Sequence, residues 1–257
     1  MSTVDLALDY KVATLLINRA DKRNALTQQM WQQLSDHCDT LLHEVKPKLL
    51  LLRAAGGKAF SAGADIEELQ HNLLDQAWLN HNNQLVQQAQ LKLQRLPFST
   101  LAVIEGVCVG GGLGLALCCD FRLATQDARF AITPAKLGLL YSIEDTRRLV
   151  KLVGEARAKW LLYTGELQDA ATAAEWGLVH QLCAAEQLDP LLAQWQEKLL
   201  AVSRISVSGI KQTIAHINDD PVSDEASVRP LFDQAFLQPD FKQAAAAFVS
   251  KQRMEFP

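Results

Sequence analysis

Two glycine-rich turns constrain this 257-residue chain more than any other feature. The first occupies residues 60–66 and the second residues 106–114. Each follows an apolar run, residues 49–52 and 101–104, that reads as a buried strand, and each opens into a segment that can form a helix. The repeated strand, turn and helix order indicates two turns of the same kind in one α/β core.

Turns of this kind can expose backbone N–H groups. Two such groups aimed at one point stabilise an enolate or a tetrahedral oxyanion without a charged side chain. Glycine at a turn between a strand and a helix also permits close packing alone. Both interpretations stay open for either turn by itself, and the presence of two turns favours the first.

The rest of the chain alternates strand and helix patterns. Residues 4–8 and 12–17 predict a β-hairpin, Thr27 precedes a helical pattern to about residue 45, and residues 66–96 read as mostly helical with polar, Gln- and Asn-rich solvent faces. From about residue 143 the pattern is largely helical. The sequence therefore predicts an α/β fold with a helical C-terminal appendage.

Composition and charge exclude several classes of protein. The formal net charge of −4 argues against a general nucleic-acid surface. No stretch is apolar and long enough to span a membrane, and the N-terminus lacks the pattern of a secretory signal, so we expect a cytoplasmic protein. We also expect no metal site, because the histidines are scattered and the cysteines lack ligand spacing. The five cysteines are expected to be reduced, buried thiols: Cys38, Cys108, Cys118, Cys119 and Cys183.

Motifs along almost the whole chain resemble the enoyl-CoA hydratase/isomerase (crotonase) superfamily. Besides the two turns, they lie at residues 18–26, 137–139, 146–149, 153–154, 164–165, 173–179 and 247–253. The resemblance implies a crotonase-like ββα spiral core over residues 1–195 and a C-terminal helical trimerisation region over residues 196–257. It further implies a homotrimer or homohexamer and an acyl-CoA substrate. No cofactor is implied other than the coenzyme A of that thioester.

The resemblance also assigns roles to individual residues. The N–H groups of Ala64 and Gly111 would bind the thioester oxygen, and Arg23 would contact phosphate. Residues 62–66 would cradle the adenine end, and residues of the last helix would reach coenzyme A, often in a neighbouring subunit. The substrate-binding set is Arg23, Ala25, Ala62, Ala64, Asp65, Ile66, Gly110, Gly111, Phe248 and Lys251. One cation common in relatives is replaced by Glu67.

Two positions depart from the hydratase pattern. Hydratases of the family place glutamates where this chain has Gly114 and Pro134. Neither residue carries a group that can transfer a proton, so the paired-carboxylate route to adding water is missing. An isomerase- or decarboxylase-like reaction, which needs mainly enolate stabilisation and one proton-transferring group, survives both losses.

Candidates for the missing catalyst lie between Gly138 and Thr146. They are Tyr141, Glu144 and Asp145. The two acids could equally form an acidic first turn of a helix, and the tyrosine could be a packing residue. We therefore favour an enzyme that works through an enolate, with a catalytically silent acyl-CoA-binding protein and an interaction or RNA-binding relative as alternatives.

Overall fold

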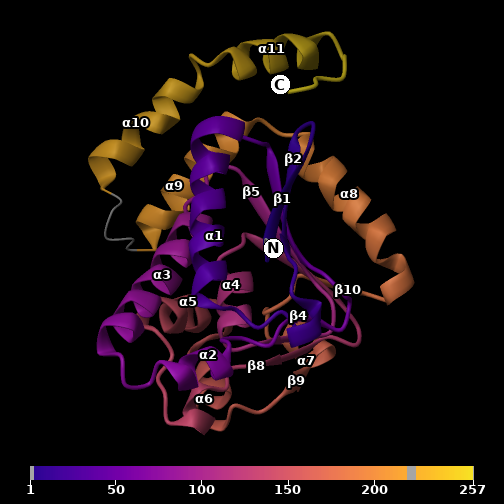
Figure 1. Ribbon diagram of the computed structural model, residues 1–257. Helices are drawn as coiled ribbons and strands as arrows, with labels where there is room; N and C mark the ends of the chain where they lie inside the picture. The colour runs from indigo at the N-terminus through magenta and orange to yellow at the C-terminus, as the bar shows by residue number, and fades with distance from the viewer. Residues whose placement is uncertain (1–2, 219–223, 257) are drawn as a thin grey trace.

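The computed structural model describes residues 3–218 and 224–256, which form layers of helices around two β-sheets (Figure 1). The larger sheet has six strands in the order β1-β2-β3-β5-β7-β10. All its pairs are parallel except the β1–β2 hairpin. The strands are β1 Val4–Asp9, β2 Val12–Ile17, β3 Leu49–Ala54, β5 Ser99–Ile104, β7 Phe121–Thr125 and β10 Gln181–Cys183.

A second sheet has four strands, which alternate along the chain with strands of the larger sheet. Its order is β4-β6-β8-β9, with strands β4 Ala59–Ser61, β6 Val107–Val109, β8 Arg129–Ala131 and β9 Gln168–Asp169. Strands β3, β5 and β7 are each followed within a few residues by a short strand of this sheet and then by a helix. The repeated strand–strand–helix unit confirms the predicted ββα spiral core.

Helices cover both faces of the larger sheet. The first part of the chain contributes α1 Gln28–Thr40, α2 Ile66–His71, α3 Gln76–Gln94 and α4 Gly111–Leu117. The middle contributes α5 Ile143–Val153, α6 Glu155–Thr164 and α7 Ala170–Glu175. Thr27 caps α1 as expected, by accepting a hydrogen bond from the N–H of Met30. The helical pattern over residues 66–96 forms two helices, because Asp75 accepts from Trp78 and starts α3 anew.

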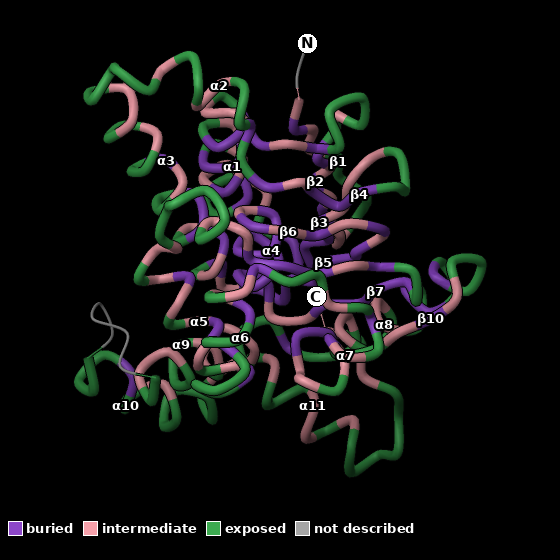
Figure 2. The backbone as a smooth tube through the Cα atoms, turned by 90° about the horizontal axis from the view of Figure 1, so that it is seen from below, coloured by how far each residue is buried: buried purple, intermediate pink, exposed green. Residues whose placement is uncertain are grey.

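The core lies on the two sides of β3 and β5, because successive side chains of a strand point to opposite faces. Leu50 and Leu52 belong to the larger apolar cluster, together with side chains of α1, α3 and α4. Leu49 and Leu51 face the other way, toward Leu188 and Leu192 of α8. Buried segments accordingly fill the middle of the molecule in Figure 2. All five cysteines are buried and unpaired, as predicted.

The C-terminal region consists of α8 Leu188–Leu200, α9 Arg204–Ile217, α10 Glu225–Ala235 and α11 Pro239–Val249. Helix α9 is tied to the core by Lys211, whose Nζ donates to Asp120 Oδ2 at 2.8 Å. Figure 1 shows α10 and α11 standing away from the sheets. The expected division between residues 195 and 196 falls inside α8, and it stays a prediction. No helix within the described ranges is long and apolar enough to cross a membrane.

Candidate active site

The pairing of β4 with β6 brings the two glycine turns together. Ser61 pairs with Cys108, so the turn after β4 lies beside the turn after β6. A Cβ built on Gly63 would lie 3.0 Å from Val109 O and 3.4 Å from Gly111 N. Gly63 also has a φ of +91°, which favours glycine. Close packing therefore accounts for this glycine, and the same packing sets the two turns side by side.

The backbone N–H of Ala64 points away from Leu26, the residue with which Ala64 is paired. Leu26 and Ala64 form an isolated parallel bridge, in which Leu26 N donates to Gly63 O and Asp65 N donates to Leu26 O. Because a parallel bridge uses the groups that flank Ala64, its own N–H faces the other side. It donates to no atom of the described residues.

The backbone N–H of Gly111 opens α4. Residues in the first turn of a helix have no intrahelical acceptor for their N–H groups, and Gly111 is the first. A Cβ built on Gly111 would lie 3.9 Å from Ala64 N and 3.5 Å from Trp31 Cζ2. Both amides thus border one small space, with the Trp31 ring beside it.

The segment before α1 buttresses the first turn. Asn24 is buried, and its Nδ2 donates to Ala59 O at 2.7 Å and to Ala55 O at 2.9 Å. Ser61 Oγ donates to Asn24 O, and Ala62 N donates to Arg23 O. These bonds connect the predicted binding segments 18–26 and 60–66 directly.

A cavity of about 320 Å³ lies beside this segment. Its lining includes Arg23, Lys58 and Asn24, with the Arg23 side chain exposed. Two cationic side chains at one small cavity suit an anionic group such as phosphate. The position of the replaced family cation, Glu67, holds Lys22 in an exposed ion pair at 3.0 Å.

Asp65 anchors the start of α2. Its Oδ1 accepts from Glu68 N at 2.9 Å, and its Oδ2 pairs with Arg19 Nη1 at 2.5 Å. Burial raises the pKa of Asp65, but the Glu68 N–H and the Arg19 guanidinium outweigh it and bring the pKa below its usual range. The Asp65 carboxylate therefore has a structural role, next to the exposed side chain of Ile66.

The space beside Gly114 is filled by polar side chains from α3, from α5 and from the loop before α5. A Cβ built there would lie 2.7 Å from Asp145 Oδ1, 2.8 Å from Tyr141 Oη and 2.9 Å from Gln90 Nε2. Gly114 follows Gly111 by three residues, about 4.5 Å along the helix axis. The structure thus gathers Tyr141 and Asp145 within one helical turn of the paired amides.

Ser142 and Arg148 hold the Asp145 side chain, which is 3% exposed. Its Oδ1 accepts from Arg148 Nη2 at 2.8 Å, and its Oδ2 accepts from Ser142 Oγ at 2.9 Å. Arg148 in turn donates to the side-chain oxygens of Gln90 and Gln94. Glu144 is not part of this cluster, because consecutive helical residues point in different directions.

Sequence reasoning missed Gln90. The polar pattern of residues 66–96 indicated solvent faces, but Gln90 is 1% exposed and its Nε2 has no hydrogen-bond partner among the described residues. Only its position on α3, facing α4 and α5, reveals its proximity to Gly114. Burial and the nearby Asp145 charge raise the pKa of Tyr141 well above its ordinary value.

Pro134 is the second of the two positions at which the sequence departs from the hydratase pattern. Pro134 begins a short 3-10 helix, Pro134–Leu137. The neighbouring hydroxyl of Thr133 would lie 3.7 Å from a Cβ built on Gly110. Neither of the two positions, 114 and 134, carries an acidic side chain.

The structure does not bring Phe248 or Lys251 to the glycine turns of the same chain. Both lie at the end of α11 and are exposed, Phe248 by 85%. The tail beyond them is held where β2 and β3 begin, since Lys11 and Lys48 donate to Phe256 O. The turns lie beyond the opposite, carboxyl ends of β3 and β5. Figure 1 shows α4, which follows the second turn, well apart from α11.

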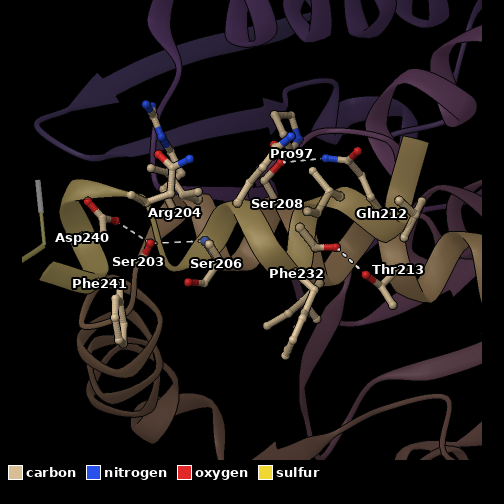
Figure 3. A pocket seen from close by; sticks show the side chains of 18 of the residues that line it. Pro97, Ser203, Arg204, Ser206, Ser208, Gln212, Thr213, Phe232, Asp240 and Phe241 are labelled. Atoms are coloured by element: carbon tan, nitrogen blue, oxygen red, sulfur yellow. Dashed lines mark hydrogen bonds between the residues drawn. The ribbon is translucent and has the colours of Figure 1, made fainter. Parts of the chain in front are cut away.

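A larger cavity of about 1390 Å³ lies among the C-terminal helices, away from the turns. Figure 3 shows Ser203, Ser206 and Gln212 at this cavity, together with Phe232 of α10 and Phe241 of α11. Its lining includes no residue of the glycine turns. This cavity is therefore distinct from the candidate active site.

The Arg19–Asp65 pair predicts acid-dependent stability. Because the Asp65 pKa is lowered by folding, its contribution is present above the ordinary carboxylate pKa and lost as the pH falls through the folded value. Asp65→Asn, which can still cap α2, should lower the unfolding free energy by about 1–3 kcal/mol at pH 7. Urea denaturation at neutral and acid pH measures this difference.

The exposed cap of α3 supplies the control. Asp75→Asn changes a capping carboxylate in the same way but removes no arginine pair. We expect a smaller loss at pH 7 for this variant. A loss in Asp65→Asn that persists undiminished in acid would show that the Arg19–Asp65 pair is not its source.

Comparison with known proteins places the chain in a family. The family model described as enoyl-CoA hydratase/isomerase matches residues 9–257. Crotonyl-CoA hydratase of Syntrophomonas wolfei is 30% identical over 255 residues, covering 98% of this chain and 96% of that protein. The short-chain-enoyl-CoA hydratase of Clostridium acetobutylicum is 28% identical, covering 99% and 97%.

Solved structures agree with the sequence matches. The crystal structure of an enoyl-CoA hydratase/isomerase family protein from Hyphomonas neptunium superposes with a TM-score of 0.94 at 31% identity. It covers 100% of this chain and 98% of that one. The fold, the order of the motifs and these matches agree, and the chain belongs to the enoyl-CoA hydratase/isomerase family, whose members process acyl-CoA thioesters.

Proposed function

We propose that the chain stabilises a thioester enolate between the N–H groups of Ala64 and Gly111, and that it isomerises or decarboxylates acyl-CoA rather than hydrating it efficiently. The observation that carries the proposal is the cluster at Gly114. Where a hydratase would hold a glutamate, the Asp145 carboxylate and the Tyr141 hydroxyl approach from α5 and the loop before it. A proton acceptor is thus retained near the paired amides, but in a different place.

A single base at this position suits proton transfer along the acyl chain. Removing a proton from C2 generates an enolate, whose oxygen the two amides would stabilise. Returning the proton at C4 completes an isomerisation with one group, and Asp145 is the acid that lies beside Gly114. Loss of carbon dioxide needs the same enolate and one proton donor. Adding water requires the two carboxylates that are missing.

Binding of coenzyme A would follow the family pattern where this chain retains it. Arg23, at the 320 Å³ cavity, would contact phosphate. Residues 62–66 would carry the adenine end, and Ala25 and Gly110 would line the path to the thioester. Phe248 and Lys251 could take part only from a neighbouring copy, because α11 lies at the other end of the sheet. Coenzyme A would enter as part of the substrate, with no separate cofactor.

A silent acyl-CoA-binding protein is the second candidate. Both Asp145 oxygens already accept hydrogen bonds, from Arg148 and Ser142. A carboxylate held in this way resembles a structural ion pair, which would leave the paired amides as a binding site without a base. Exchange of the C2 proton of a bound acyl-CoA in deuterated water separates the two candidates, because only the enzyme would catalyse it.

We also propose that the protein is a cytoplasmic homotrimer or homohexamer. Phe232, Phe236, Phe241 and Phe248 are exposed on α10 and α11 of the single chain, and apolar surface of this kind marks an interface. Light scattering at micromolar concentration should give three or six times the 28.4 kDa chain mass. Only monomer under these conditions would contradict the proposal.

Removing the Gly111 N–H should impair the proposed oxyanion site. Gly111→Pro deletes this donor, and proline is tolerated at the first position of a helix. We expect acetyl-CoA binding to weaken about two- to tenfold, the effect of one hydrogen bond. Proton exchange at C2 in deuterated water should fall by about 10²–10³, because the donor acts on the enolate. Calorimetry and NMR measure the two effects.

Gly111→Ala is the matched control, since it retains the N–H and its Cβ makes only ordinary contact with Trp31. It should bind and exchange like the wild type. Equal behaviour of the proline and alanine variants would remove Gly111 from the proposed site.

Hydration of crotonyl-CoA should be slow. Each missing acid/base group costs about 10²–10⁴ in rate, so little should remain beyond oxyanion catalysis. Loss of enoyl-thioester absorbance measures hydration, with C2 exchange followed in parallel. Asp145→Asn should abolish exchange, whereas Glu144→Gln should leave it intact.

Rapid hydration that survives Asp145→Asn would contradict this choice of catalyst. Absence of both reactions for every acyl-CoA that binds would replace the enzyme proposal with the silent binder.

A further inference from the structure

The peptide unit between Gly110 and Gly111 has hydrogen-bonding groups on both sides. Its N–H borders the space shared with Ala64 N. Its carbonyl oxygen accepts two bonds, from Gly114 N at 3.0 Å and from Tyr141 Oη at 3.2 Å. The first is the ordinary bond of a helix start, whereas the second comes from a side chain outside α4.

We propose that Tyr141 is a positioning residue that acts through this peptide: its hydroxyl, by donating to Gly110 O, fixes and polarises the unit whose N–H binds the thioester oxygen. The inference rests on the proposed oxyanion site. It gives Tyr141 a role other than proton transfer to the substrate.

Because the peptide unit is planar, a hydrogen bond to its carbonyl oxygen also restrains its N–H. The six atoms of the unit move together, so holding the oxygen sets the direction of the Gly111 N–H. Gly110 needs such a restraint, because its φ of 53° and ψ of −123° are open to glycine, which is also the most mobile residue. A bond to the carbonyl also polarises the amide and strengthens its N–H as a donor, by about 10–30%.

The glycine at position 114 is part of the same arrangement. Its missing side chain leaves room for the Tyr141 hydroxyl, which would lie 2.8 Å from a Cβ there. A glutamate at this position would displace the hydroxyl from Gly110 O. Loss of the family acid and gain of the tyrosine contact are thus two consequences of one residue.

The ionisation of Tyr141 suits a permanent donor. Burial and the Asp145 charge raise its pKa well above the ordinary value, so the hydroxyl keeps its proton throughout the neutral range. A group of this kind is a poor general acid at neutral pH. It supplies the Gly110 carbonyl with the same bond at every working pH.

The test compares the wild type with Tyr141→Phe, which removes only the hydroxyl, and uses acetyl-CoA labelled with ¹³C at the thioester carbonyl. Infrared difference spectroscopy should show the bound carbonyl at lower wavenumber than the free one, with a smaller displacement in Tyr141→Phe. The rate of C2 exchange should fall about two- to tenfold, the effect of one hydrogen bond, with an unchanged pH profile.

Two further variants sharpen the test. Gly114→Ala should reduce the displacement in the same way, because its Cβ would lie 2.8 Å from the Tyr141 hydroxyl and force it to move, while alanine favours the helix. The same Cβ also meets Asp145 Oδ1 and Gln90 Nε2, and Asp145→Asn separates an effect on the carboxylate from an effect on the hydroxyl. Asp145→Asn should retain the displacement although it loses exchange.

Each contrary result has a distinct meaning. The same carbonyl displacement in Tyr141→Phe and the wild type would overturn the inference. So would a loss of exchange of about 10²-fold or more with a changed pH profile, the signature of a general acid. A wild type that binds acetyl-CoA without any displacement would overturn the oxyanion site itself, and the inference with it.

Discussion

The pairing of β4 with β6 is the interaction on which the rest of the site depends. It joins two strands of three residues each, and by itself contributes little to stability. Its consequence is positional, because each strand ends in a glycine turn and the two turns can approach only where side chains are absent. A Cβ built on Gly63 would lie 3.0 Å from Val109 O and 3.4 Å from Gly111 N, so a side chain at this position would crowd the second turn. The register of the pairing shifts by one residue between Ala59 and Ser61, and Ser61, the last residue of β4, lies opposite Cys108.

The chemistry of the site follows from what surrounds the paired amides. Gly114 has no side chain, and polar groups of α3, of α5 and of the loop before α5 occupy the space beside it. Gln90, Asp145 and Arg148 form a buried network in which the Arg148 guanidinium pairs with the Asp145 carboxylate, whereas Gln90 Nε2 and Arg148 Nε have no hydrogen-bond partner among the described residues. In the mechanism that we propose, the Asp145 carboxylate would act from α5, in place of a glutamate at position 114 of α4, and would move a proton from a different direction.

Local patterns predicted much of this fold. The apolar runs before each turn, the Thr27 cap and the helix that follows the second turn all depend on neighbours in the chain. Gln90 could not be found in this way, since its burial results from packing of α3 on α4 and α5, and its local sequence resembles a solvent face. The separation of Phe248 and Lys251 from the turns likewise depends on the path of the whole C-terminal region. The resemblance assigned roles to these two residues, but it did not predict their positions in the fold.

The central claim is that two backbone amides share one oxygen of the substrate. The most direct measurement is the amide proton chemical shift of Ala64 and Gly111 in ¹⁵N-labelled protein, before and after saturation with acetyl-CoA. A hydrogen bond to the thioester oxygen should move both protons downfield together, whereas that of Gly165, whose N–H already bonds Leu161 O, should stay in place. Saturation with acetyl-CoA that leaves the Ala64 and Gly111 protons unmoved would contradict the account.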